Sequence, residues 1–133
     1  MRTLRDLEVT NGGLYDKIIN ILKNADKNVF ELANVKSNPS YASVLEGSKI
    51  ARENSVDLIL AVGGGSVIDC AKAISVSAYC EGDPWKKYWT NFEDVTCKTI
   101  PVGAVLTMAG TGSESNGGSV ITNEEKMIKN GKV

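Results

Sequence analysis

The chain has 133 residues, of which 42% are hydrophobic and 23% are charged. This length makes one domain or a part of one, and this composition excludes a mainly disordered protein. Because the formal net charge is only −1, the chain offers no general electrostatic attraction to nucleic acid or to an anionic membrane, and neither is expected as a partner.

The first third of the chain predicts two helices separated by a strand. A helix over roughly residues 13–24 is indicated by apolar residues that share one helical face, namely Leu14, Ile18, Ile21 and Leu22. Residues 27–32 predict a short strand. Asn38 as N-cap and Pro39 in the first helical position are typical of a helix entry, and this helix should end near Asn54.

A nearly continuous apolar run, Val56 to Val62, predicts a central strand buried on both faces. Three glycines and Ser66 follow at once. We expect Ser66 to be the N-cap of the next helix and Asp69, three residues on, to complete a capping box. The apolar face of that helix is made mostly of small residues: Val67, Cys70, Ala71, Ile74 and Ala78.

The rest of the chain is less regular. Residues 80–97 predict a loop with one helical turn at 84–89, and residues 99–102 predict a short strand. Residues 107–118, which are rich in glycines and hydroxyls, predict a functional loop. Residues 119–122 suit a strand, and the polar stretch 123–132 has no apolar partner in the chain.

This alternation of helices and strands predicts an α/β fold with a parallel sheet. In such sheets ligands bind beyond the carboxyl ends of the strands. Gly63–Ser66 lie at such an end, where glycines allow close approach and the first N–H groups of a helix attract anions. We predict a phosphate or pyrophosphate there, with a ligand-free tight turn as the alternative.

A second cluster, Thr107–Glu114, combines glycines with hydroxyl groups. Its N–H and O–H donors suit an anion or a ribose, and a solvated surface loop is the alternative. Neither cluster has the spacing of the GxGxxG or P-loop fingerprint.

The chain contains no histidine, which excludes His-based catalytic triads and imidazole metal sites built from this chain alone. It has three cysteines without CxxC spacing, and residues 1–10 lack the apolar core of a secretory signal, so we expect reduced thiols and a cytoplasmic location. Cys70 is expected in the core, and Cys80 and Cys97 are expected to be partly exposed.

Three segments occur in a specific order: AVGGGSVIDCAKAIS, EGDPW and TMAGTGSESNGGSVITNEEK. Together they resemble the nucleotide-binding domain of the iron-containing (group III) alcohol dehydrogenases, nearest to the NAD(P)H-dependent butanol dehydrogenases. The resemblance implies a Rossmann-like parallel sheet with flanking helices, which in the family precedes an all-helical domain that holds a divalent metal. We expect residues 1–133 to be a partial dinucleotide-binding domain, with 1–10 atypical and 11–133 family-like.

The resemblance also implies the cofactor, which is NAD or NADP, bound weakly by this chain. It assigns one residue to the adenosine end, a cradle for the pyrophosphate, two hydroxyls to the nicotinamide and ribose side, and two later contacts. In chain order the cofactor-binding residues are Asn38, Gly64, Gly65, Ser66, Asp69, Thr107, Thr111, Val120 and Lys129. No catalytic or metal-binding residue is expected here, and Fe or Zn belongs only to the intact family enzyme.

The chain departs from the family pattern at both ends. Family members open with a strand and a glycine-rich loop that helps to choose between NAD and NADP. Leu4 and Leu7 have helical spacing and no glycine precedes Gly12, so we expect this first strand to be absent or replaced. The chain also stops before the family's Asp and His metal ligands, as a truncated product, a remnant or an excised piece would.

The expected function is the cofactor-positioning part of an oxidoreductase that transfers hydride between NAD(P)H and a primary alcohol or aldehyde. The chain alone should be inactive, and it should self-associate or pair with a separate metal-domain chain. One alternative is a non-catalytic nucleotide-binding or interaction module, and another is part of a polyol or phosphosugar dehydrogenase. We expect Trp85 and Trp89 to pack locally, with a place in the substrate pocket of the complete enzyme as the alternative.

Overall fold

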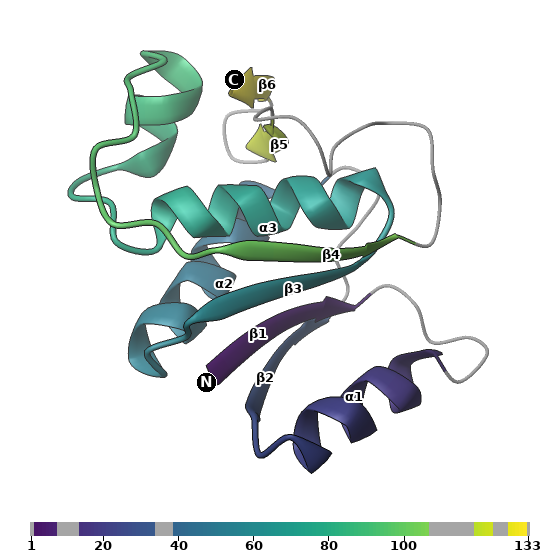
Figure 1. Ribbon diagram of the computed structural model, residues 1–133. Helices are drawn as coiled ribbons and strands as arrows, with labels where there is room; N and C mark the ends of the chain where they lie inside the picture. Colours follow the sequence, from purple (N-terminus) through teal and green to yellow (C-terminus); the bar gives the residue numbers. More distant parts are fainter. Residues whose placement is uncertain (1, 8–13, 34–38, 107–118, 124–127, 133) are drawn as a thin grey trace.

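The computed structural model describes residues 2–7, 14–33, 39–106, 119–123 and 128–132. Strands and helices alternate along the first half of these residues (Figure 1). The elements are β1 (Arg2–Leu7), α1 (Leu14–Asn24), β2 (Asn28–Ala33), α2 (Tyr41–Glu53), β3 (Leu58–Gly63), α3 (Gly65–Ser77), the π-helix η1 (Trp85–Thr90), β4 (Val102–Leu106), β5 (Ser119–Asn123) and β6 (Ile128–Lys132).

The main sheet has four parallel strands in the order β2-β1-β3-β4. This confirms the predicted α/β class and places the apolar strand β3 inside the sheet. Leu4 of β1 pairs with Phe30 of β2 on one side and with Ile59 of β3 on the other. Because all four strands run the same way, their carboxyl ends meet at one edge.

The expectation that the first strand is absent or replaced is wrong. Residues 2–7 form β1, which pairs along its whole length with β2 and over most of it with β3. The spacing of Leu4 and Leu7 suggests a helix only if the segment is considered alone. Pairing with two neighbouring strands overrides this local preference, as tertiary context often does for strands.

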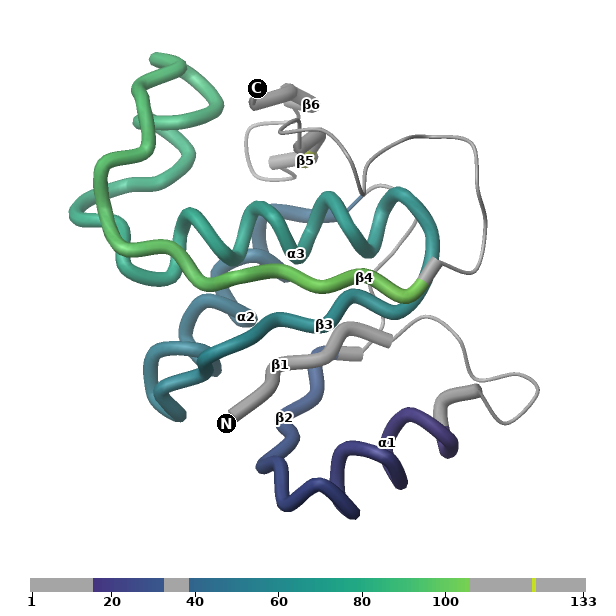
Figure 2. Tube along the Cα trace, viewed as in Figure 1, coloured from purple at the N-terminus to yellow at the C-terminus, as the bar shows by residue number. Residues whose placement is uncertain are grey.

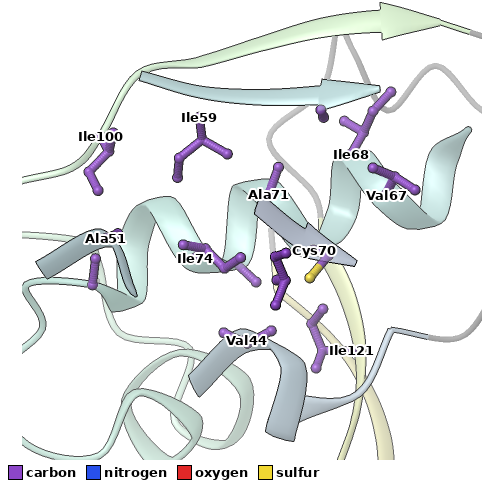
Figure 3. Close-up of a cluster of buried hydrophobic side chains, with 14 of the residues drawn as sticks. Val44, Ala51, Ile59, Val67, Ile68, Cys70, Ala71, Ile74, Ile100 and Ile121 are labelled. Carbon is purple, nitrogen blue, oxygen red and sulfur yellow. The ribbon is translucent and has the colours of Figure 1, made fainter. Parts of the chain in front are cut away.

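Helices α2 and α3 pack against each other on the sheet, whereas α1 contacts β2 on the other side of it (Figure 1). The core surrounds α3, whose apolar face is buried as the spacing predicts. Val44 of α2, Ile59 of β3, Ile74 of α3 and Ile121 of β5 are all fully buried there (Figure 3). Helix α3 therefore lies between the main sheet and the β5–β6 hairpin.

Strands β5 and β6 form a separate antiparallel pair, with Ile121 opposite Asn130. The predicted strand at 119–122 is thus confirmed. The polar stretch 123–132 contains β6, whose partner is the backbone of β5. Backbone pairing of this kind cannot be read from the pattern of hydrophobic residues in the sequence.

Two predicted element starts are shifted. Helix α2 begins at Tyr41, and its N-cap is Ser40, whose hydroxyl accepts a hydrogen bond from the Ser43 N–H at 3.2 Å. Pro39 therefore precedes the helix, and Asn38 lies outside the described residues. Strand β4 begins at Val102, after the Pro101 carbonyl has accepted a hydrogen bond from the Ile59 N–H at 2.9 Å.

The helical turn predicted at 84–89 is present as η1, with π-helical hydrogen bonding. Trp85 and Trp89 are buried, and their rings stack with centroids 5.9 Å apart and planes 10° from parallel. The Tyr41 hydroxyl donates to Asp83 Oδ1 at 3.0 Å and accepts from the Trp85 N–H at 3.1 Å. The local packing expected of the two tryptophans is confirmed. The hydrogen bonds of Tyr41 connect η1 to the start of α2.

None of the helices in the described ranges has the length and apolar character needed to cross a membrane.

Candidate functional site

The turn between β3 and α3 requires glycine at its first position. Gly63 has a backbone φ of 154°, a value that L-residues with a side chain rarely adopt. A Cβ atom added to Gly63 would lie 2.8 Å from Cγ2 of Val67 in the first turn of α3. Glycine therefore lets the chain pass sharply from the buried strand into the helix.

Helix α3 begins earlier than the sequence predicts. Its N-cap is Gly64, which is extended and provides no side-chain cap, and the Ile68 N–H donates to the Gly64 carbonyl at 3.2 Å. Ser66 is therefore a residue of the first turn, so its predicted N-cap role and the capping box with Asp69 are wrong. Because Gly63 and Gly64 complete the turn, helical geometry is already established at Gly65.

This geometry suits an anion. The first N–H groups of a helix have no acceptor within the helix and lie at the positive end of its dipole. Here the cap residue Gly64 has no side-chain oxygen that could accept from these N–H groups. Because Gly64 and Gly65 have no side chain beyond Cα, neither blocks the approach of a ligand to the helix N-terminus. Such a helix start is where proteins commonly bind a phosphate or pyrophosphate.

The sheet directs other candidate residues to the same edge. Gly63 pairs with Leu106 at the end of β4, and Val62 pairs with Leu7 at the end of β1. Thr107 follows Leu106 directly in the sequence. Strands β1, β3 and β4 therefore all end at the edge where ligands bind in parallel α/β sheets.

Only part of the predicted cofactor-binding set lies within the described residues. Gly64, Gly65, Ser66 and Asp69 lie in the first two turns of α3 or at its cap. Asn38, Thr107 and Thr111 lie outside the described residues. Val120 lies in β5, and Lys129 lies in β6 opposite Thr122.

Lys72 was not among the predicted residues. Its Nζ atom lies 3.7 Å from Asp69 Oδ1, and both side chains are only 17% exposed. The spacing of an acid and a base three residues apart on a helix was the available signal. This ion pair fixes the Asp69 side chain near the start of α3.

The described residues offer no cluster of side chains that could bind the divalent metal of the family. The chain contains no histidine, and within the described residues no group of three or more Cys, Asp and Glu side chains could hold a metal ion.

The parallel sheet and its glycine turn define a Rossmann-like α/β protein. Within that class, the chain belongs to the iron-containing alcohol dehydrogenase family, which it matches over residues 4–133. The resemblance seen in the sequence is thereby confirmed.

Individual relatives agree with this assignment. The chain is 46% identical over 129 residues to the probable NADH-dependent butanol dehydrogenase 1 of Bacillus subtilis, covering 92% of this chain and 31% of that protein. It is 41% identical over 116 residues to the NADPH-dependent aldehyde reductase YqhD of Escherichia coli, covering 86% of this chain and 29% of that protein. The crystal structure of NADH-dependent butanol dehydrogenase A from Thermotoga maritima superposes with a TM-score of 0.87 at 36% identity, covering 98% of this chain and 33% of that one.

The chain therefore spans about a third of the length of the relatives that it matches. The rest of each of those proteins has no counterpart in these 133 residues.

Proposed function

We propose that the chain is the nucleotide-binding portion of an oxidoreductase that transfers hydride between NAD(P)H and a primary alcohol or aldehyde. The observation that carries this proposal is the glycine turn at the start of α3, because its cap residue brings no side chain to the helix N-terminus. Two of the relatives are named as an NADH-dependent butanol dehydrogenase and an NADPH-dependent aldehyde reductase, which supports this cofactor and this substrate class.

In this proposal, the backbone N–H groups at Gly64, Gly65 and Ser66 bind the cofactor's pyrophosphate. Asp69, which pairs with Lys72, belongs to the same cofactor-binding turn. Asn38 would contact the adenosine end, and Thr107, Thr111, Val120 and Lys129 the remainder of the cofactor. When bound, the cofactor supplies or accepts the hydride. The chain's own part is to bind and orient it.

Residues 1–133 would then form part of a dinucleotide-binding domain that depends on further protein for chemistry. A divalent metal, Fe or Zn, would be held by other ligands, in the same protein or in a separate metal-domain chain. Such a metal polarises the substrate oxygen, so this chain alone should show no turnover. The odd number of cysteines supports a cytoplasmic, reducing location.

Self-association is also proposed, although not because of a missing strand. Within the described residues, β2 and β4 are the ends of the four-stranded sheet. A strand at the end of a sheet presents N–H and C=O groups that a second chain can pair with.

The nucleotide proposal is tested by titration calorimetry with NADH, NADPH and ADP. We expect weak binding by the native chain and at least a ~10-fold loss in Gly65→Val, because the branched side chain would fill the space of the phosphate. The control is Gly103→Ala on β4, where an added Cβ would lie 3.5 Å from Leu60 Cδ1, an ordinary contact.

Circular dichroism should show that both variants remain folded. Equal affinities of the native chain and a folded Gly65→Val variant would remove the glycine turn from the nucleotide site. Loss of binding in Gly103→Ala as well would show that the effect is not local.

A further inference from the structure

Helix α3 carries two charged side chains, Asp69 and Lys72, and they form an ion pair with each other. Lys72 Nζ lies 3.7 Å from Asp69 Oδ1, and each side chain is only 17% exposed. In the pair of Lys49 and Glu53 on α2, by contrast, the side chains are 69% and 62% exposed. Water and salt therefore screen the charges of the α3 pair much less than those of an ordinary surface pair.

The geometry of the helix places this pair beside the glycine turn. Figure 2 shows the chain passing from the end of β3 directly into the first turn of α3. Asp69 follows Gly65 by four residues, so it lies one turn further along the same face of the helix. A side chain on a helix leans toward the N-terminus and covers the preceding turn. The Asp69 carboxylate is therefore the side-chain charge of α3 nearest to the proposed phosphate position.

An unpaired carboxylate at Asp69 would oppose nucleotide binding. The N–H groups and the dipole at the start of α3 attract an anion, whereas a negative charge one turn away repels it. The Lys72 ammonium offsets this negative charge at close range, so the pair as a whole carries no net charge. Lys72 can thus remove the repulsion without having to contact the nucleotide.

We propose that Lys72 is a positioning residue of the nucleotide site, whose ammonium neutralises and holds the Asp69 carboxylate so that a pyrophosphate can bind at the start of α3. This role rests on the proposed function, since it concerns the same site. It makes a different prediction from a purely structural ion pair. If the pair only stabilised α3, loss of either partner would weaken nucleotide binding, whereas under neutralisation the two losses act in opposite directions.

The test measures the affinity for ADP, which carries the pyrophosphate without the nicotinamide half, by titration calorimetry of folded variants at low ionic strength. Lys72→Met leaves the Asp69 carboxylate unpaired and should bind ADP at least ~5-fold more weakly than the native chain. Asp69→Asn leaves the Lys72 ammonium unpaired and should bind ADP at least ~5-fold more tightly. The double variant should return to within ~2-fold of the native affinity, because both charges are then absent.

The matched control is Lys49→Met, which makes the same change in net charge at an exposed ion pair and should bind ADP like the native chain. Lys72→Arg should also keep the native affinity, because arginine retains the positive charge. Weaker binding by both single variants would overturn the proposal, since it would show that the pair is only structural. Native affinity in Lys72→Met would overturn it as well.

The same titrations separate this role from the proposed function. If the native chain binds no ADP, the proposed function fails and the role of Lys72 fails with it. If the native chain binds ADP but the variants do not follow the expected pattern, only the role of Lys72 fails. Tighter binding is required of Asp69→Asn alone, so an unfolded Lys72→Met variant would not leave the proposal untested.

Discussion

The backbone at Gly63 decides the geometry of the candidate site. This residue combines a positive φ with a close approach to Val67, and both features follow from the sharp passage from β3 into α3. The sequence made the three glycines conspicuous but did not distinguish their roles. In the structure Gly63 makes the turn, Gly64 caps the helix and Gly65 is its first residue.

Gly63→Ala should therefore destabilise the chain, whatever its effect on nucleotide binding. The added Cβ would lie 2.8 Å from Val67 Cγ2 in an unfavourable region of φ. We expect a loss of about 1–3 kcal/mol in the free energy of unfolding. Urea denaturation followed by tryptophan fluorescence measures this loss, with Gly103→Ala as the control expected to change much less. Equal losses in the free energy of unfolding for the two variants would show that a side chain at position 63 causes no strain.

At the scale of the elements, predictions succeeded where the signal was local. The run from Val56 to Val62 and the small apolar residues of α3 correctly indicated an interior strand and its covering helix. Burial of that strand on both faces was predicted, but Leu58 and Leu60 are only partly buried. Strand β1 was missed because its partners, β2 and β3, are distant in sequence. Strand β6 was missed because it pairs through its backbone.

The presence of each helix was predicted better than its first residue, because several residues near each helix start were plausible N-caps. Asn38 and Ser66 both looked suitable, yet the structure uses Ser40 for α2 and Gly64 for α3. At α3 this difference bears on function, since a glycine cap brings no side chain to the helix N-terminus. At α2 it bears on stability, since the Ser40 hydroxyl bonds to the Ser43 N–H.

Ser40→Ala should thus lower the free energy of unfolding by about 1 kcal/mol, the usual cost of losing an N-cap hydroxyl. Ser43→Ala is a matched control, because its own backbone N–H, the donor in the capping bond, is kept. Thermal unfolding monitored by circular dichroism compares the two. A larger loss in Ser43→Ala than in Ser40→Ala would contradict the assigned cap.

For the whole molecule, the feature that bears on function is the glycine turn at the start of α3, where we propose a nucleotide site. The glycine turn lies at one end of α3, at the carboxyl edge of the sheet. Cys80 follows the other end of α3 in the chain, and the Cys97 thiol donates to the Val76 carbonyl there. We propose that a nicotinamide nucleotide binds at the N-terminus of α3.

The most direct test is nuclear magnetic resonance of the ¹⁵N-labelled chain during titration with NADH. We predict that the backbone amide signals of Gly64, Gly65 and Ser66 shift more than those of the rest of α3, because the proposed site places the pyrophosphate at their N–H groups. The signals of Cys80 and Cys97, at the other end of the helix, should stay nearly constant. Shifts confined to that other end, or no shift at the start of α3 when NADH binds, would contradict the account.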